Sequence, residues 1–77
     1  MSVKDLILMA NQIGSFFEYY PWEEGVKGVA DHIKKFWHPM MKEELLRYCE
    51  EYGDLELIPI VRAALERLKD ELYEEKS

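Results

Sequence analysis

The sequence predicts a small all-α fold, a compact bundle of four helices that forms a single domain over residues 1–77. Apolar residues recur at spacings of three and four along most of the chain, which is the pattern of amphipathic helices. Prolines at positions 21, 39 and 59 separate segments of helical length. Four glycines and three prolines are too few for a β-rich fold with many tight turns, and 48% apolar residues argue against disorder.

The first helix is predicted over residues 3–19. Ser2 and Asp5 have the spacing of a capping box, with Asp in the place of the usual Glu or Gln. Pro21 ends the helix, because the residue before a proline is pushed away from helical geometry. Its apolar stripe consists of Leu6, Met9, Ala10, Ile13, Phe16, Phe17 and Tyr20.

The second helix is predicted over residues 23–37, since Glu23 and Glu24 suit a helix N-terminus. Gly25 and Gly28 weaken its first turns and mark either a close approach of another element or a frayed end. Its apolar stripe consists of Val26, Val29, Ala30, Ile33, Phe36 and Trp37.

Two further helices are predicted over residues 39–52 and 59–74, each opening with a proline, which lacks the N–H that a first helical position leaves unpaired. Gly53 is the expected left-handed cap of the third helix. The charged end of the chain from about residue 70 is predicted to fray. The predicted core consists of Leu6, Ala10, Ile13, Phe17, Val29, Ile33, Phe36, Leu45, Cys49, Val61, Leu65 and Leu68.

The charge pattern excludes two kinds of partner. Sixteen acidic and ten basic residues give a net charge of −6, and no segment is basic, so nucleic acid and anionic membrane are not expected partners. No apolar run approaches the roughly 20 residues of a membrane span. The first residues lack the layout of a signal peptide, and one free cysteine suits a reducing compartment, so a cytoplasmic location is predicted.

Residues that could carry chemistry do not form a recognisable set. His32 and His38 lie about 120° apart around a helix, with no second cysteine near Cys49, so no zinc site is expected. Cys49 falls on an apolar stripe, where cysteine behaves as a small buried hydrophobe. The four glycines stand apart and form no phosphate loop. We therefore expect no catalytic residues and no bound metal, flavin or nucleotide.

Two features indicate a partner-binding surface. Aromatic residues fill five of the seven positions from Phe16 to Trp22, and neighbours on a helix point about 100° apart, so some should stay exposed. The amides of Asn11 and Gln12 lie near an apolar face and would bond the connection between helices two and three, another chain, or solvent. The surface is expected where the first helix meets Pro21 and the second meets Pro39, with Trp37 at the rim or, alternatively, in the core. The predicted contact residues are Asn11, Gln12, Phe16, Tyr20, Trp22, His32, Trp37 and Pro39.

The same residues carry a family resemblance. Met9-Ala10-Asn11-Gln12-Ile13 with Phe16-Phe17, followed by Val29-Ala30-Asp31-His32-Ile33 and Lys35-Phe36-Trp37 with Pro39 and Met41, resembles the delta subunit of soluble NAD-dependent formate dehydrogenase. The segment 57–68 is similar to the C-terminal part of that family. The chain departs from it at Met40, where the family typically has arginine.

The resemblance implies a non-catalytic accessory subunit, structural or concerned with assembly. In that enzyme, the larger subunits oxidise formate and carry the molybdenum or tungsten pterin cofactor, the iron–sulfur clusters and FMN. The implied partner is the large catalytic subunit, and the isolated chain is a candidate for self-association. The alternatives are a transient chaperone for cofactor insertion, a homodimeric helical binding or regulatory domain unrelated to formate oxidation, and an independent enzyme.

Overall fold

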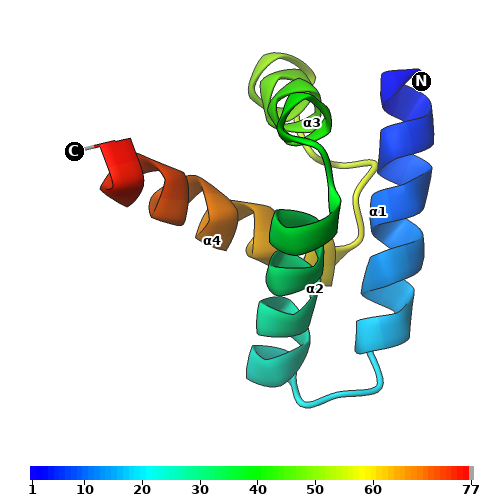
Figure 1. Ribbon diagram of the computed structural model, residues 1–77. Coiled ribbons are helices and arrows are strands. Elements are labelled where there is room, and N and C mark those ends of the chain that lie inside the picture. The colour runs from blue at the N-terminus through cyan, green and yellow to red at the C-terminus, as the bar shows by residue number, and fades with distance from the viewer. Residues whose placement is uncertain (77) are drawn as a thin grey trace.

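The computed structural model describes the backbone of residues 1–76 and the side chains of residues 1–71. It contains four helices, α1 (Val3–Phe17), α2 (Trp22–Phe36), α3 (Pro39–Tyr52) and α4 (Pro59–Lys76), and no strand within the described backbone (Figure 1). The predicted all-α fold is therefore confirmed. The backbone of α4 continues to Lys76, whereas the side chains of most of the segment predicted to fray lie outside the described residues.

The helix ends follow local chemistry. Ser2 Oγ accepts a hydrogen bond from Asp5 N at 3.3 Å, and Asp5 Oδ2 accepts one from Ser2 N at 3.3 Å, so the capping box is present. Pro39 is the first residue of α3, as predicted, and His38 Nδ1 caps the helix by accepting a hydrogen bond from Met40 N. Gly53 ends α3 with a φ of 91° and a ψ of 174°. Its φ is positive as expected, but its ψ lies outside the left-handed helical region.

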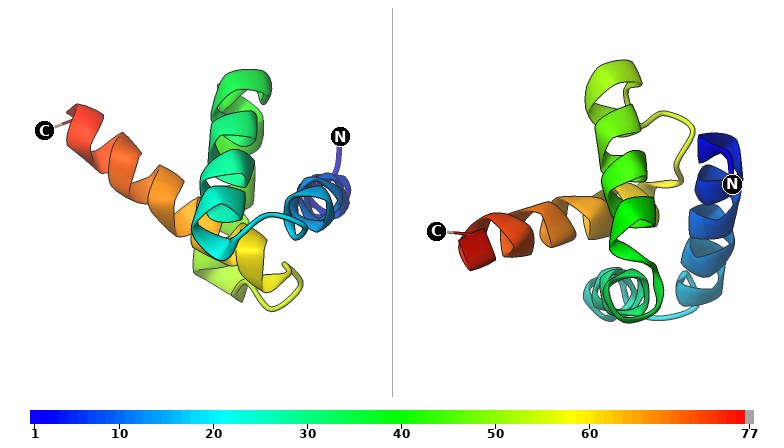
Figure 2. Two further views of the ribbon diagram at one scale, coloured as in Figure 1. Left: turned by 90° about the horizontal axis from the view of Figure 1, so that it is seen from below. Right: turned by 45° about the horizontal axis from the view of Figure 1, so that its top comes forward.

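The helices α1 and α2 form an antiparallel hairpin, and α4 packs mainly against α2 (Figures 1 and 2). The two hairpin helices approach closely because Gly25 and Gly28 face Phe17. A Cβ atom at Gly25 would lie 2.7 Å from the carbonyl oxygen of Phe17, and one at Gly28 would overlap the Phe17 ring. The helix α1 also approaches α4 closely, since a Cβ atom at Gly14 would lie 2.5 Å from Val61. Of the two readings of Gly25 and Gly28, close approach is therefore confirmed.

One hydrophobic core joins the four helices, and eight of the twelve predicted core residues are buried in it. Ile13, Phe17 and Cys49 are only half-buried and pack against its edge. The buried hydrophobic residues are Leu6, Ile7, Ala10, Val26, Val29, Ala30, Ile33, Trp37, Leu45, Leu57, Ile60, Val61, Ala64, Leu65 and Leu68.

The prediction for Phe36 is wrong, and the rim position expected for Trp37 is wrong too. Phe36 is 72% exposed, whereas Trp37 is only 6% exposed. The reason is that α2 ends at Phe36 and Trp37 is extended, with φ −85° and ψ 138°. The extended backbone turns the indole ring inward, where helical spacing would have placed Phe36.

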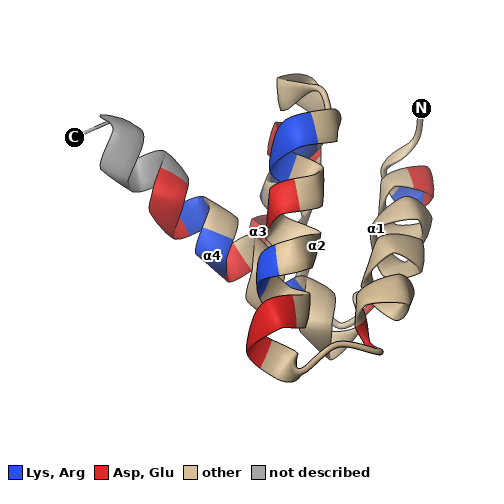
Figure 3. Cartoon of the chain, turned by 60° about the horizontal axis from the view of Figure 1, so that its bottom comes forward, with Lys and Arg blue, Asp and Glu red and all other residues tan. Residues whose placement is uncertain are grey.

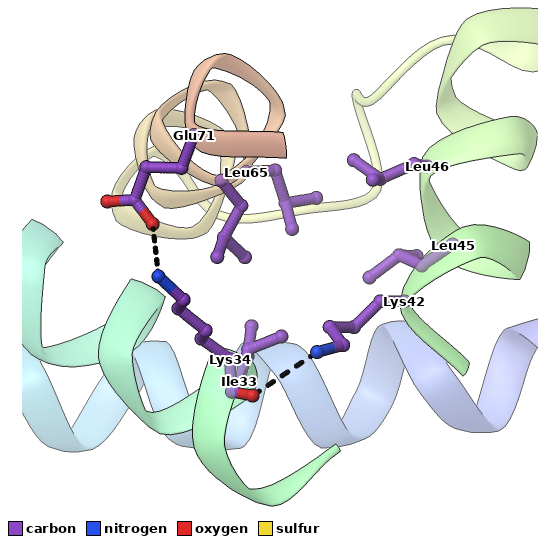
Figure 4. A pocket seen from close by; sticks show the side chains of 8 residues that line it. Ile33, Lys34, Lys42, Leu45, Leu46, Leu65 and Glu71 are labelled. Carbon is purple, nitrogen blue, oxygen red and sulfur yellow. Dashed lines mark hydrogen bonds and ion pairs between the residues drawn. The ribbon is translucent and has the colours of Figure 1, made fainter. Parts of the chain in front are cut away.

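A small apolar cavity of about 20 Å³ lies where α2, α3 and α4 meet (Figure 4). Ile33, Leu45 and Leu65 form part of its wall, and Lys34 crosses its edge. The ammonium of Lys34 pairs with Glu71 at 3.3 Å, and Lys42 Nζ donates a hydrogen bond to the carbonyl oxygen of Lys34. Ligand pockets measure roughly 300–1,000 Å³, so this cavity is a packing gap and not a ligand site.

Candidate functional site

A groove with a volume of about 430 Å³ lies between α1 and α2. One wall is formed by residues of α1 that are spaced by three and four in the sequence, because such residues share one side of a helix. None of the residues that line the groove is acidic, lysine or arginine. They are Met9, Gln12, Ile13, Phe16, Phe17, His32 and Trp37.

Each wall of the groove is held by aromatic contacts. The ring of Phe16 packs edge-on against Phe17 with ring centres 5.1 Å apart, and Tyr20 stacks obliquely on Phe17 at 5.5 Å. On the α2 side, the ring centres of His32 and Phe36 lie 4.9 Å apart. Phe17 is therefore partly buried, while Phe16 and Phe36 are exposed.

The exposed side of α1 continues this apolar surface. No charged residue occurs between Leu6 and Phe17, and Figure 3 shows this part of α1 in tan, without blue or red. Leu8, Phe16 and Tyr19 are exposed although each is apolar or aromatic, and Tyr19 is 92% exposed. We call the groove together with the exposed residues of α1 and of the turn to α2 the α1–α2 face.

The α1–α2 turn adds further exposed aromatic side chains. Tyr20 and Trp22 are exposed on either side of Pro21. The turn is tight, since Tyr20 N donates to the carbonyl oxygen of Phe17 at 3.1 Å and Gly25 N donates to that of Pro21 at 2.8 Å. The predicted residues Phe16, Tyr20 and Trp22 are therefore brought to one end of the hairpin.

Asn11 has an internal role that the sequence did not reveal. Its Nδ2 donates to the carbonyl oxygen of Glu56 at 2.9 Å, and its Oδ1 accepts from Ile58 N at 2.9 Å. The amide thus ties α1 to the connection between α3 and α4, not to the connection between α2 and α3. Gln12, its neighbour, is exposed in the groove wall and makes no hydrogen bond with another described residue.

The predicted contact residues do not all meet at one end. Pro21 precedes α2 and Pro39 follows it, so the two prolines lie at opposite ends of this helix of 15 residues, which is roughly 22 Å long. Gln12, Phe16, His32 and Trp37 line the groove between those ends. Pro39 is exposed at the start of α3, away from the aromatic turn.

The helices α3 and α4 enclose a second, polar cleft of about 90 Å³. Lys69 and Glu50 pair across it at 3.4 Å, and Cys49 lines it beside Asp54. Burial, with a smaller effect of the Asp54 charge, raises the pKa of the Cys49 thiol. A raised pKa keeps the thiol protonated near neutrality, and the thiolate is the nucleophilic form, so Cys49 is not an activated nucleophile.

Among the side chains of residues 1–71, no group of three His, Cys, Asp or Glu residues is arranged to hold a metal ion. Nor does any helix of the described chain have the length and apolar character needed to cross a bilayer.

The described residues thus define a small all-α protein whose most distinctive surface is the α1–α2 face, with its exposed apolar and aromatic side chains. The profile of the NADH-dependent formate dehydrogenase delta subunit, FdsD, matches residues 5–65, and the chain belongs to this family. The match ends within α4 and includes every residue that lines the groove and the whole α1–α2 turn. No curated protein and no solved structure gives a significant match.

Proposed function

We propose that this chain is a non-catalytic accessory subunit that docks, through its α1–α2 face, on the large molybdenum- or tungsten-containing subunit of a cytoplasmic NAD-dependent formate dehydrogenase. Membership of the delta-subunit family supports the complex, and the exposed uncharged face of α1 is the observation that carries the docking role.

Exposing the apolar side chains of this face to water is unfavourable in free energy unless another surface covers them. Burying apolar area contributes about 25 cal/mol per Å², and large apolar patches on soluble proteins mark sites of interaction. Aromatic side chains are enriched at interfaces because they bury a large area with few rotatable bonds. Phe16, Tyr20 and Trp22 offer that area without being needed to fill the core, since all three are exposed.

Within the proposed contact set, the side chains divide by role. Phe16, Tyr20 and Trp22 act as apolar anchors, and Gln12 and His32 supply polar contacts from the groove walls. Asn11 and Trp37 support the face from within, because Asn11 is bonded to the α3–α4 connection and Trp37 is buried beneath the groove. Pro39 belongs to the opposite end of the hairpin.

The test is an affinity purification of the tagged chain from its native cell, with the partners sized and their metal content measured. We expect a large molybdenum- or tungsten-containing subunit in a constant ratio to the chain in the active complex. An assembly factor would instead be recovered with inactive enzyme and would be missing from the active complex. Recovery of the chain only as a homodimer, with no oxidoreductase subunit, would contradict the proposal.

A further inference from the structure

The α1–α2 turn combines exposed aromatic rings with negative charge. Residues 16–24 contain five aromatic residues and three carboxylates, Glu18, Glu23 and Glu24, and no basic residue. All three carboxylates are exposed. None of them forms an ion pair with another residue of the part of the chain whose side chains are described.

The fold gathers these groups around one turn. Glu18 follows Phe17 and Glu24 precedes Gly25, and a Cβ atom at Gly25 would lie only 2.7 Å from the Phe17 carbonyl oxygen. In the sequence, Glu18 directly precedes the exposed Tyr19, and Glu23 directly follows the exposed Trp22. Figure 3 shows the acidic residues at the end of α1 and in the first turn of α2. Lys27, the nearest basic residue in the α2 sequence, is one turn further along the helix.

The helix N-terminus explains only part of this arrangement. Glu23 and Glu24 lie in the first turn of α2, where a negative charge stabilises the helix by about 0.3–1 kcal/mol. Glu18, however, follows the last residue of α1, and the C-terminus of a helix disfavours an acidic residue. The helix ends therefore do not account for Glu18, whose exposed carboxylate is available to a positive charge on a partner.

We infer that the partner surface covering the α1–α2 turn is arginine-rich, with guanidinium groups that stack on Tyr19 and Trp22 and pair with Glu18, Glu23 and Glu24. Arginine suits both contacts, since its planar guanidinium stacks on aromatic rings and pairs with carboxylates in a fork geometry. The inference rests on the proposed function and adds to it the chemistry of the surface that the catalytic subunit presents.

The charges of the turn are tested by measuring binding of the purified chain to the purified catalytic subunit at low and high salt. The triple variant Glu18→Gln, Glu23→Gln, Glu24→Gln should bind about tenfold more weakly at low salt and lose most of its salt dependence, because charges at an interface rim act through screened attraction. The matched control, Glu43→Gln, Glu44→Gln, Glu51→Gln, removes three exposed carboxylates from α3 and should bind like the wild type.

Substitutions of Tyr19 distinguish stacking of a guanidinium group on the ring from simple apolar contact. Tyr19→Phe keeps the aromatic ring and should retain binding, whereas Tyr19→Leu keeps apolar area without a π face and should weaken binding severalfold. Both variants should fold normally, since Tyr19 is 92% exposed.

The outcomes distinguish the inference from the function on which it rests. Wild-type binding that salt and the turn variants leave unchanged would overturn the arginine-rich surface while the docking proposal stood. Equal weakening by the α3 control would also overturn it, because net charge alone would then govern association. Absence of any wild-type binding would overturn both.

Discussion

The α1–α2 hairpin and the α3–α4 half of the molecule share one core but have different outer surfaces. Between Leu6 and Phe17 the first helix carries no charge, and its groove is lined without an acidic, lysine or arginine side chain. The cleft between α3 and α4 is lined instead by Glu50, Arg62 and Lys69, among others, and is bridged by the Lys69–Glu50 ion pair.

This difference between the two outer surfaces shows which exposed side chains contribute to the stability of the fold and which do not. On the described part of α3 and α4, charged residues pair with one another, as Lys69 does with Glu50, or are exposed to solvent. The exposed aromatic residues of the α1–α2 face contribute little to the core and remain uncovered in the chain alone. This difference is the reason for proposing that the partner binds the α1–α2 face.

The largest expected effect contrasts two neighbouring aromatic residues of the hairpin. Trp37→Ala should lower the free energy of unfolding by about 3–5 kcal/mol, because the buried indole leaves a cavity. Phe36→Ala should change it by no more than about 0.5 kcal/mol, because the ring is exposed. Urea denaturation followed by circular dichroism measures both. Equal losses from the two variants would show that α2 continues helically through Trp37.

A second contrast uses the two adjacent amides of α1. Asn11→Ala should cost about 1–3 kcal/mol of stability, because it leaves Ile58 N and the Glu56 carbonyl without their partner. Gln12→Ala should leave stability nearly unchanged, since the side chain makes no internal hydrogen bond with a described residue. Thermal melting of both variants checks this, and faster amide exchange at Ile58 in Asn11→Ala would locate the effect.

These two contrasts also show how far sequence reasoning reaches. Helical spacing, the Ser2 capping box and the prolines predicted every helix to within two residues at its described ends, because these signals act locally. The partner of Asn11 could not be predicted, since Glu56 and Ile58 are 45 and 47 residues away in sequence. Nothing in the amphipathic pattern distinguishes a structural amide from an exposed one.

The wrong predictions for Phe36, which is exposed, and for Trp37, which is buried, have a different cause. Periodicity assigns faces correctly only while the helix continues, and α2 ends one residue before Trp37. The expectation of a single docking end failed for a third reason, since it neglected that antiparallel helices place their C-termini at opposite ends. The groove residues Met9, Ile13 and Phe17 were assigned to the apolar stripe, and only the packing of α2 shows that part of that stripe stays open.

A smaller effect distinguishes two close contacts of α1: Gly14 of α1 faces α4, and Gly28 of α2 faces Phe17 of α1. Gly14→Ala should destabilise by about 1–2 kcal/mol, because the new methyl group meets Val61, Ile58 and Ile60 at 2.5–3.1 Å in the packed core. Gly28→Ala should cost less, since the Phe17 ring is half-buried and can move into the open groove, and since alanine favours the helix by up to about 1 kcal/mol. Chemical denaturation of both variants tests the order. A larger loss for Gly28→Ala would mean that the groove wall is rigid.

The smallest effect concerns Tyr48, whose hydroxyl donates to Glu56 Oε1 at 3.1 Å. This hydrogen bond to the carboxylate raises the pKa of Tyr48 above its usual 10.0. Because the folded-state pKa is raised, the bond stabilises the fold below the ordinary pKa of tyrosine and is lost as pH rises through the raised value. Glu56→Gln should lower the pKa of Tyr48, as followed by ultraviolet absorbance of tyrosinate with Tyr48→Phe as the reference. An unchanged titration would show that the bond does not form.

The central claim, that the α1–α2 face binds the partner, is tested most directly by retention of the catalytic subunit on two matched double variants. Phe16→Ala with Trp22→Ala removes two exposed aromatic residues from this face, and Tyr52→Ala with Leu55→Ala removes two exposed apolar side chains from the other half. All four side chains are exposed, so both variants should melt like the wild type. We expect the first to reduce retention at least tenfold, equivalent to about 1.4 kcal/mol, and the second to leave it unchanged. Full retention by the first variant, or a loss confined to the second, would contradict the account.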